Sequence, residues 1–104
     1  MTALSITFHS TESIKEKWEI FRQKELTELI ENFLDVEHYL LSKVRSEMIQ
    51  EGENTNLFLL FESEMKKQEF FESELTNLVE RVETRFPSEV MTFVTHLDPI
   101  KMRI

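Results

Sequence analysis

The chain has 104 residues and a formal net charge of −8, from 20 acidic and 12 basic side chains. This excess of carboxylates disfavours binding to nucleic acids and to anionic membrane surfaces, because both carry negative phosphates. The absence of cysteine excludes disulfides, thiolate metal sites and thiol nucleophiles. A hydrophobic content of 40% with a single glycine predicts one folded domain over residues 1–104, built from long regular elements.

The sequence gives no sign of export or membrane insertion. Its first residues lack the basic segment and the long apolar segment of a signal peptide. No apolar run approaches the roughly 20 residues that a membrane-spanning helix needs. We therefore expect a cytoplasmic protein.

A half-buried strand is predicted over residues 3–9. Leu4, Ile6 and Phe8 fall on one face of an extended chain, and polar residues fall on the other.

A helix is predicted next, from about residue 12 to about residue 33. Ser13 and Glu16 have the spacing of a capping box, although Ser10 or Thr11 are alternative caps. Apolar residues then recur at steps of three, four and five, which predicts a helical stripe that faces the core. Its members are Ile14, Trp18, Phe21, Leu26, Leu29, Ile30 and Phe33.

Residues 36–49 fit two interpretations. Val36, Leu40, Val44 and Met48 recur every four residues, which places them on one side of either a helix or a strand. The following apolar segment needs a pairing partner, so we predict a strand here. The segment 51–54 contains the only glycine and predicts a hairpin turn with that glycine at a positive φ angle.

Residues 57–61, Leu-Phe-Leu-Leu-Phe, are apolar on both faces of a strand. A strand of this type must be covered on both sides. Helices of the same chain can cover one side, and a second subunit or a ligand is needed for the other.

A second helix is predicted from Glu64 to about Arg85, beginning after Ser63 and ending before Pro87. Residues 89–97 predict the last strand. The apolar stripe of the helix consists of Phe71, Leu75, Leu78, Val79, Val82 and Phe86.

The order strand, helix, strand, strand, helix, strand predicts an α+β, ferredoxin-like βαββαβ fold. Its four-stranded antiparallel sheet has the order 4-1-3-2, with two helices on one face. The residues expected to face the helices are Leu4, Ile6, Phe8, Leu57, Leu59, Phe61 and Phe93. The residues expected on the open face are Phe58, Leu60, Thr92 and Val94.

One set of residues is distinctive: Arg85 and Phe86 end the second helix, Phe93, Thr95 and Leu97 lie in the last strand, and Trp18 lies in the first helix. This set resembles that of domain-of-unknown-function family 4286, a group of small bacterial proteins related to dimeric α/β-barrel proteins. Members tend to end the second helix in a basic residue and Phe, and to carry Phe-Arg-Thr-x-Leu in the last strand. Val94 replaces the usual Arg, which makes the predicted open face more apolar. The resemblance implies a ferredoxin-like fold and no activity.

Three histidines are the first candidates for chemistry. His9 and His96 lie on neighbouring antiparallel strands, near opposite ends of the predicted sheet, and His38 begins an edge strand. No pair has the spacing of a metal site. We predict solvated histidines or dimer contacts and no metal or cofactor.

The remaining candidates favour structural roles. Trp18 lies on the helical stripe, which favours a core position over ligand stacking. Tyr39 is either a proton donor or a dimer contact, and we favour the contact. The many glutamates on the two helices predict a solvated face rather than paired catalytic carboxylates. A single glycine cannot build a phosphate-binding loop.

Two functions remain for comparison. The first is a non-enzymatic homodimeric binding or interaction module, with Tyr39, Phe58, Leu60 and Val94 as interface residues. The second is a small-molecule enzyme or haem-binding protein of the dimeric α/β-barrel type, for which His9, Trp18 and His96 are the possible pocket residues. The second helix lacks the histidine that haem-degrading members carry. We predict no catalytic residues, and the likeness in fold does not by itself transfer function.

Overall fold

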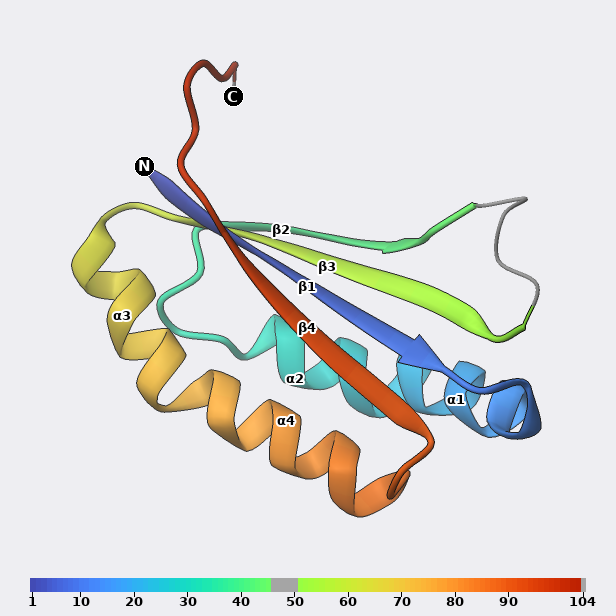
Figure 1. The fold of residues 1–104 in the computed structure, drawn as a ribbon. Helices are drawn as coiled ribbons and strands as arrows, with labels where there is room; N and C mark the ends of the chain where they lie inside the picture. The colour runs from blue at the N-terminus through green and yellow to red at the C-terminus, as the bar shows by residue number, and fades with distance from the viewer. Residues whose placement is uncertain (46–50, 104) are drawn as a thin grey trace.

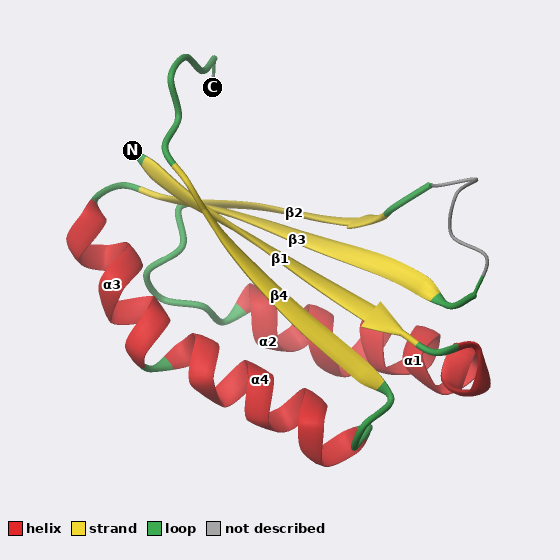
Figure 2. Cartoon of the chain, viewed as in Figure 1, coloured by secondary structure: helices red, strands yellow, loops and turns green. Residues whose placement is uncertain are grey.

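A computed structural model describes residues 1–45 and 51–103. It has two layers, a four-stranded antiparallel sheet and a layer of helices on one face of it (Figure 1; Figure 2). The strands are β1 (Thr2–Ser10), β2 (His38–Lys43), β3 (Glu53–Phe61) and β4 (Val90–Leu97), in the order β2-β3-β1-β4. The ferredoxin-like fold, the strand order and the placement of the helices are confirmed.

The core lies between the sheet and the helices. Leu4, Ile6 and Phe8 of β1 are fully buried there, opposite Leu59 and Leu57 of β3. Residues directly opposite each other in an antiparallel pair share a face of the sheet. The helix-facing residues predicted on β1 and β3 are therefore confirmed.

The first helical segment is continuous but irregular. It consists of a short 3-10 turn (Glu12–Ile14), α1 (Lys15–Phe21), a π-helical turn (Arg22–Leu26) and α2 (Thr27–Glu31). Thr11 is the first cap, and no side chain forms the predicted capping box. The wider π turn takes up the extra residue between Phe21 and Leu26, so both remain buried.

The second helical segment is interrupted, which was not predicted. It consists of α3 (Glu64–Glu72) and α4 (Glu74–Arg85), separated by Ser73, whose hydroxyl donates to the Glu69 carbonyl at 2.7 Å. The break changes the phase of the stripe. Phe70 is fully buried, whereas Phe71, which we predicted in the stripe, is 37% exposed.

The faces predicted for β4 are wrong. Val94 lies opposite Ile6 and therefore on the helix-facing side, together with Thr92, whereas Phe93 lies opposite Thr7 on the open face. The alternating residues of this strand are apolar on both sides, so the pattern alone could not choose. The register with β1, in which Val94 pairs with Ile6 and Phe93 with Thr7, defines the faces of the strand.

The hairpin between β2 and β3 differs from its prediction in length. β2 ends at Lys43, and the part of the predicted strand over 46–49, with Met48, lies outside the described residues. β3 begins at Glu53, inside the predicted turn. Gly52 has a φ of 84°, as expected.

Replacement of Gly52 by alanine tests this turn. An added Cβ would lie 2.4 Å from the carbonyl oxygen of Ser10 and 3.0 Å from the His9 ring, in a backbone conformation that side chains rarely adopt. We expect Gly52→Ala to lower the free energy of unfolding by more than about 1 kcal/mol in urea titrations. Ser88→Gly, at the other positive φ, should change it by less than about 0.5 kcal/mol. Equal effects would contradict this view of the turn.

Candidate functional site

The open face of the sheet is apolar at one end. We define the open face as the side away from the helices; at this end Leu40, Phe58 and Ser5 lie side by side, and Leu60 and Ala3 form the next row. Leu40 is 61% exposed and Phe58 is half-buried, whereas Leu60 is already buried. The predictions that Phe58 and Leu60 lie on this face are confirmed.

The other end of the open face is polar and carries an oriented histidine. Nδ1 of His9 lies 2.6 Å from Oδ1 of Asn54. A carboxamide oxygen only accepts, so Nδ1 donates and the neutral ring keeps its lone pair on Nε2. The Asn56 amide donates to the hydroxyl oxygens of Ser5 at 2.8 Å and Thr7 at 3.1 Å.

The edge strand β4 adds exposed apolar side chains to this face. Phe93 lies beside Thr7 and is 52% exposed, and Met91 lies beside His9 and is 56% exposed. The open face thus combines hydrogen-bonding groups in the middle of the sheet with uncovered apolar groups around them. Such a surface can associate with a second apolar surface or hold a small ligand.

The structure does not bring the predicted pocket residues together. His9 lies on the open face, and Trp18 is buried between the layers. His96 lies opposite Leu4 on the helix-facing side, at the other end of the sheet, where its ring is 5.3 Å from that of Phe71.

The remaining predicted interface residues lie at the margins. Tyr39, on β2, lies opposite Leu59 on the helix-facing side and is 48% exposed at the sheet edge. Val94 is on the same side of the opposite edge strand and is 36% exposed. Neither side chain points to the open face. Their role as dimer contacts stays a prediction, and such contacts would have to form at the two edges of the sheet.

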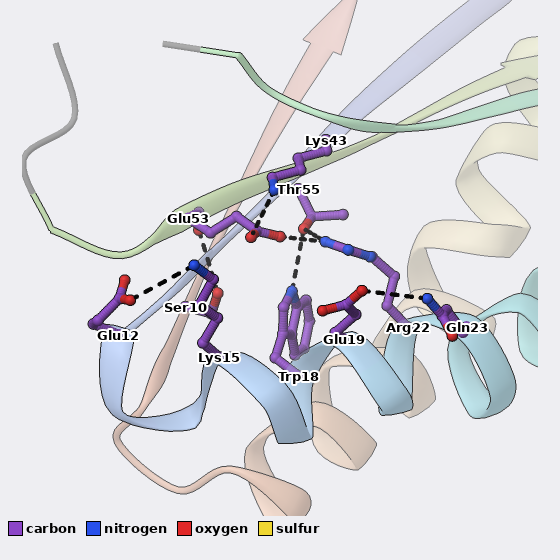
Figure 3. A network of polar contacts seen from close by, with 10 residues as sticks. All are labelled: Ser10, Glu12, Lys15, Trp18, Glu19, Arg22, Gln23, Lys43, Glu53 and Thr55. Atoms are coloured by element: carbon purple, nitrogen blue, oxygen red, sulfur yellow. Dashed lines mark hydrogen bonds and ion pairs between the residues drawn. The ribbon is translucent and has the colours of Figure 1, made fainter. Parts of the chain in front are cut away.

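A polar network lies beneath the sheet, and the sequence did not predict it (Figure 3). The indole N–H of Trp18 donates to the Thr55 hydroxyl at 3.1 Å, and Arg22 donates to the same oxygen at 3.3 Å. Arg22 also pairs with Glu53, whose second carboxylate oxygen lies 3.5 Å from Lys43 Nζ. The π turn positions Arg22 for these contacts.

This network joins the first helix to the β2–β3 hairpin and satisfies the buried indole N–H. Trp18 also packs against three phenylalanines, Phe8, Phe21 and Phe86, with ring centroids 5.5–5.7 Å away. Its buried position confirms the core role predicted for it. The network has no exposed nucleophile and is satisfied internally, which favours a structural role.

A groove of about 770 Å³ lies between α2 and α4 on the outer side of the helical layer. Leu29, Phe33 and Leu78 are among its apolar lining residues. Glu25, at one end, pairs with Arg85 at 2.7 Å and with Arg81 at 3.3 Å. Among residues 1–45 and 51–103, no group of three histidine or carboxylate side chains is placed to hold a metal ion. None of the described helices is long and apolar enough to cross a bilayer.

Comparison with protein families identifies the family of this chain. The model of the family described as "Domain of unknown function (DUF4286)" matches residues 1–100. The chain belongs to this family. No curated protein matches the sequence.

Solved structures with the same fold are distant in sequence. An ethyl tert-butyl ether d (EthD) family protein from Bacillus halodurans C-125 has a TM-score of 0.68 and 8% identity, covering 91% of this chain and 97% of its own. A dimeric ferredoxin-like protein from an uncultured marine organism has a TM-score of 0.66 and 12% identity, covering 100% and 99%. A putative antibiotic biosynthesis monooxygenase from Bacillus cereus has a TM-score of 0.54 and 15% identity, covering 98% and 97%. At such identities the likeness establishes the fold alone.

Removal of the Glu53 charge tests the network beneath the sheet. Glu53 and Arg22 each have side chains only 16% exposed, so Glu53→Gln leaves a largely buried guanidinium without its counter-ion. We expect a loss of about 1–3 kcal/mol in the free energy of unfolding, measured in urea. Glu12→Gln, which breaks an exposed pair with Lys15, should cost less than about 0.5 kcal/mol. A comparable loss in both variants would show that the network contributes no special stability.

The free energy of unfolding should depend on pH in opposite ways at two glutamates, Glu74 and Glu89. Burial raises the pKa of Glu74, with a smaller contribution from Asp35, so the fold favours its protonated form. Hydrogen bonds from Thr11 and Ser13 lower the pKa of Glu89, so the fold favours its ionised form. Glu74→Gln should therefore raise the free energy of unfolding at pH 7, and Glu89→Gln should lower it.

Both differences should shrink as the pH falls. The difference for Glu74 disappears below the ordinary pKa of a glutamate, and the difference for Glu89 disappears only as the pH falls through its lowered pKa in the folded chain. Urea titrations at pH 7 and pH 3 measure this. Differences of the same sign for the two variants at pH 7 would contradict the assignment.

Proposed function

We propose that this protein is a non-enzymatic homodimeric binding module whose two sheets pack through their open faces. The observation that carries the proposal is the exposure of Leu40, Phe93 and Met91 on that face, around the half-buried Phe58. Burial of apolar surface gains about 25 cal/mol per Å², so covering these side chains favours association. The marine ferredoxin-like protein, which is described as dimeric, supports the proposal by its fold.

The distribution of side chains favours one arrangement of the two subunits. When two copies stack through one face, a two-fold axis lies in the plane between the sheets. An axis parallel to the strands places the apolar end on the partner's apolar end. An axis across the strands would place each strand over the same strand of the partner with its ends reversed, so that Phe58 and Leu60 of β3 would lie over Asn56 and Asn54. Desolvation of those amides against apolar side chains costs free energy, so we favour the axis along the strands.

In this arrangement the polar ends of the two open faces, with His9 and Asn54, also lie against each other. A ligand would bind between these two ends. His9, fixed by Asn54, offers Nε2, and the Asn56 amide is oriented by Ser5 and Thr7. The hydroxyls and amides suit a small polar molecule rather than a phosphate-rich one, since the net charge of −8 repels anions. For the same reason we propose no nucleic-acid or membrane partner. We also propose a cytoplasmic location.

A second candidate is a small-molecule enzyme or haem-binding protein of the dimeric α/β-barrel type. The oriented His9 ring and the likeness to the Bacillus cereus protein favour it. A histidine base needs a substrate proton within hydrogen-bond reach, and the polar end would have to supply that pocket. A coloured or ligand-loaded protein would place this candidate first.

Substitution of Leu40 tests the dimer. Light scattering on the purified protein, with an absorbance spectrum of the same peak, should give a colourless dimer. Leu40→Glu should give a monomer, with the dimer dissociation constant raised at least about 100-fold, because the new carboxylate would be buried without a partner. Leu34→Glu is the matched control, since Leu34 is 90% exposed in the segment before β2 and should leave the dimer intact. A monomeric wild-type protein would overturn the proposal.

A further inference from the structure

Lys67 is a charged side chain buried at the edge of the core. It lies on α3, its side chain is only 3% exposed, and its Nζ lies 3.1 Å from Oε1 of Glu64. Lysine is almost never fully buried without a partner, because removing its charge from water is costly. Its counter-ion, Glu64, is 72% exposed. An exposed carboxylate therefore neutralises a buried ammonium from the solvent side.

A second donor beside this pair is poorly satisfied. Thr2, the first residue of β1, is only 5% exposed, and its hydroxyl lies next to the Glu64 carboxylate. Among the described residues, that hydroxyl has no hydrogen-bond partner of good geometry. A buried hydroxyl without a partner costs free energy, which an additional acceptor at this place would recover.

Three neighbouring side chains favour the ionised form of the Glu64 carboxylate. Lys67, then Thr2 and, more weakly, His96 lower the pKa of Glu64. The carboxylate also lies in the first turn of α3, where backbone N–H groups lack helical partners and favour negative charge. These groups come from three elements, β1, α3 and β4, and converge at one end of the sheet.

We propose that Lys67, the Thr2 hydroxyl, His96 and the start of α3 form a binding site for the carboxylate group of a small molecule, which the exposed Glu64 side chain occupies as an internal ligand. Rotation of Glu64 into solvent opens the site, and its exposure leaves room for that movement. We expect the site to bind a single carboxylate group, because the single carboxylate of Glu64 occupies it in this structure. It lies on the side of the sheet opposite the proposed dimer face, so it does not depend on dimer formation.

Rescue of a variant by acetate tests this site. Glu64→Ala removes the internal ligand and leaves Lys67 buried without a counter-ion, so its melting temperature should fall below that of the wild type. Sodium acetate should then raise it by about 5 °C or more at ten times the dissociation constant, relative to sodium chloride at equal ionic strength. The wild type should gain much less, since Glu64 competes for the same site.

The double variant Glu64→Ala, Lys67→Met is the matched control and should gain nothing from acetate. An equal gain in this control, or no gain in Glu64→Ala, would overturn the proposal. Glu64→Gln provides a second route should Glu64→Ala not fold, because it keeps the length and the oxygen of the side chain. Acetate should then shift the backbone amide signals of Thr2 and Lys67 in NMR spectra, and unchanged signals would equally overturn the site.

Discussion

The pairing of β1 on both of its edges is the constraint on which the rest of the molecule depends. Nine residues of β1 are in register with β3 and eight are in register with β4, so the side to which each β1 residue points fixes the faces of both neighbours. Leu4, Ile6 and Phe8 choose the helix-facing side because they are the apolar set of the strand. Once that choice is made, His9 must lie on the open face and His96 on the opposite one.

The helices adapt to the sheet rather than the reverse. In each of the two helical segments, one pair of buried residues is five positions apart instead of the four of a regular α-helical stripe. The pair is Phe21 and Leu26 in the first segment and Phe70 and Leu75 in the second. The extra position is absorbed by a π turn in the first segment and by a break at Ser73 in the second. Both solutions keep the apolar residues on the core, where burial is worth more than the regular hydrogen bonds that are given up. The π turn also brings Arg22 to Glu53, so a packing solution creates a polar contact.

The sequence predicts an element and its buried face well where the apolar residues fall on one side only, and poorly where they fall on both sides. The alternation of β1 and the stripe around Trp18 each admit one interpretation, and the strand order follows from connectivity. β4 carries apolar residues on both sides, so its faces depend on its register with β1, which no pattern within the strand reveals. The network of Trp18, Arg22 and Glu53 joins distant segments, and nothing local in the sequence pairs them. The step of five between Phe21 and Leu26 was the one visible sign of the π turn.

The composition of β4 has a consequence for the behaviour of the chain in the cell. The strand Val90–Leu97 is an outer edge of the sheet and contains no proline, lysine or glutamate, the residues that usually keep such edges from pairing with other chains. Its backbone can therefore pair with other extended chains, and the exposed apolar side chains of Phe93 and Met91 would favour such pairing. A partner that covered this edge would therefore protect the chain from aggregation as well as bind it.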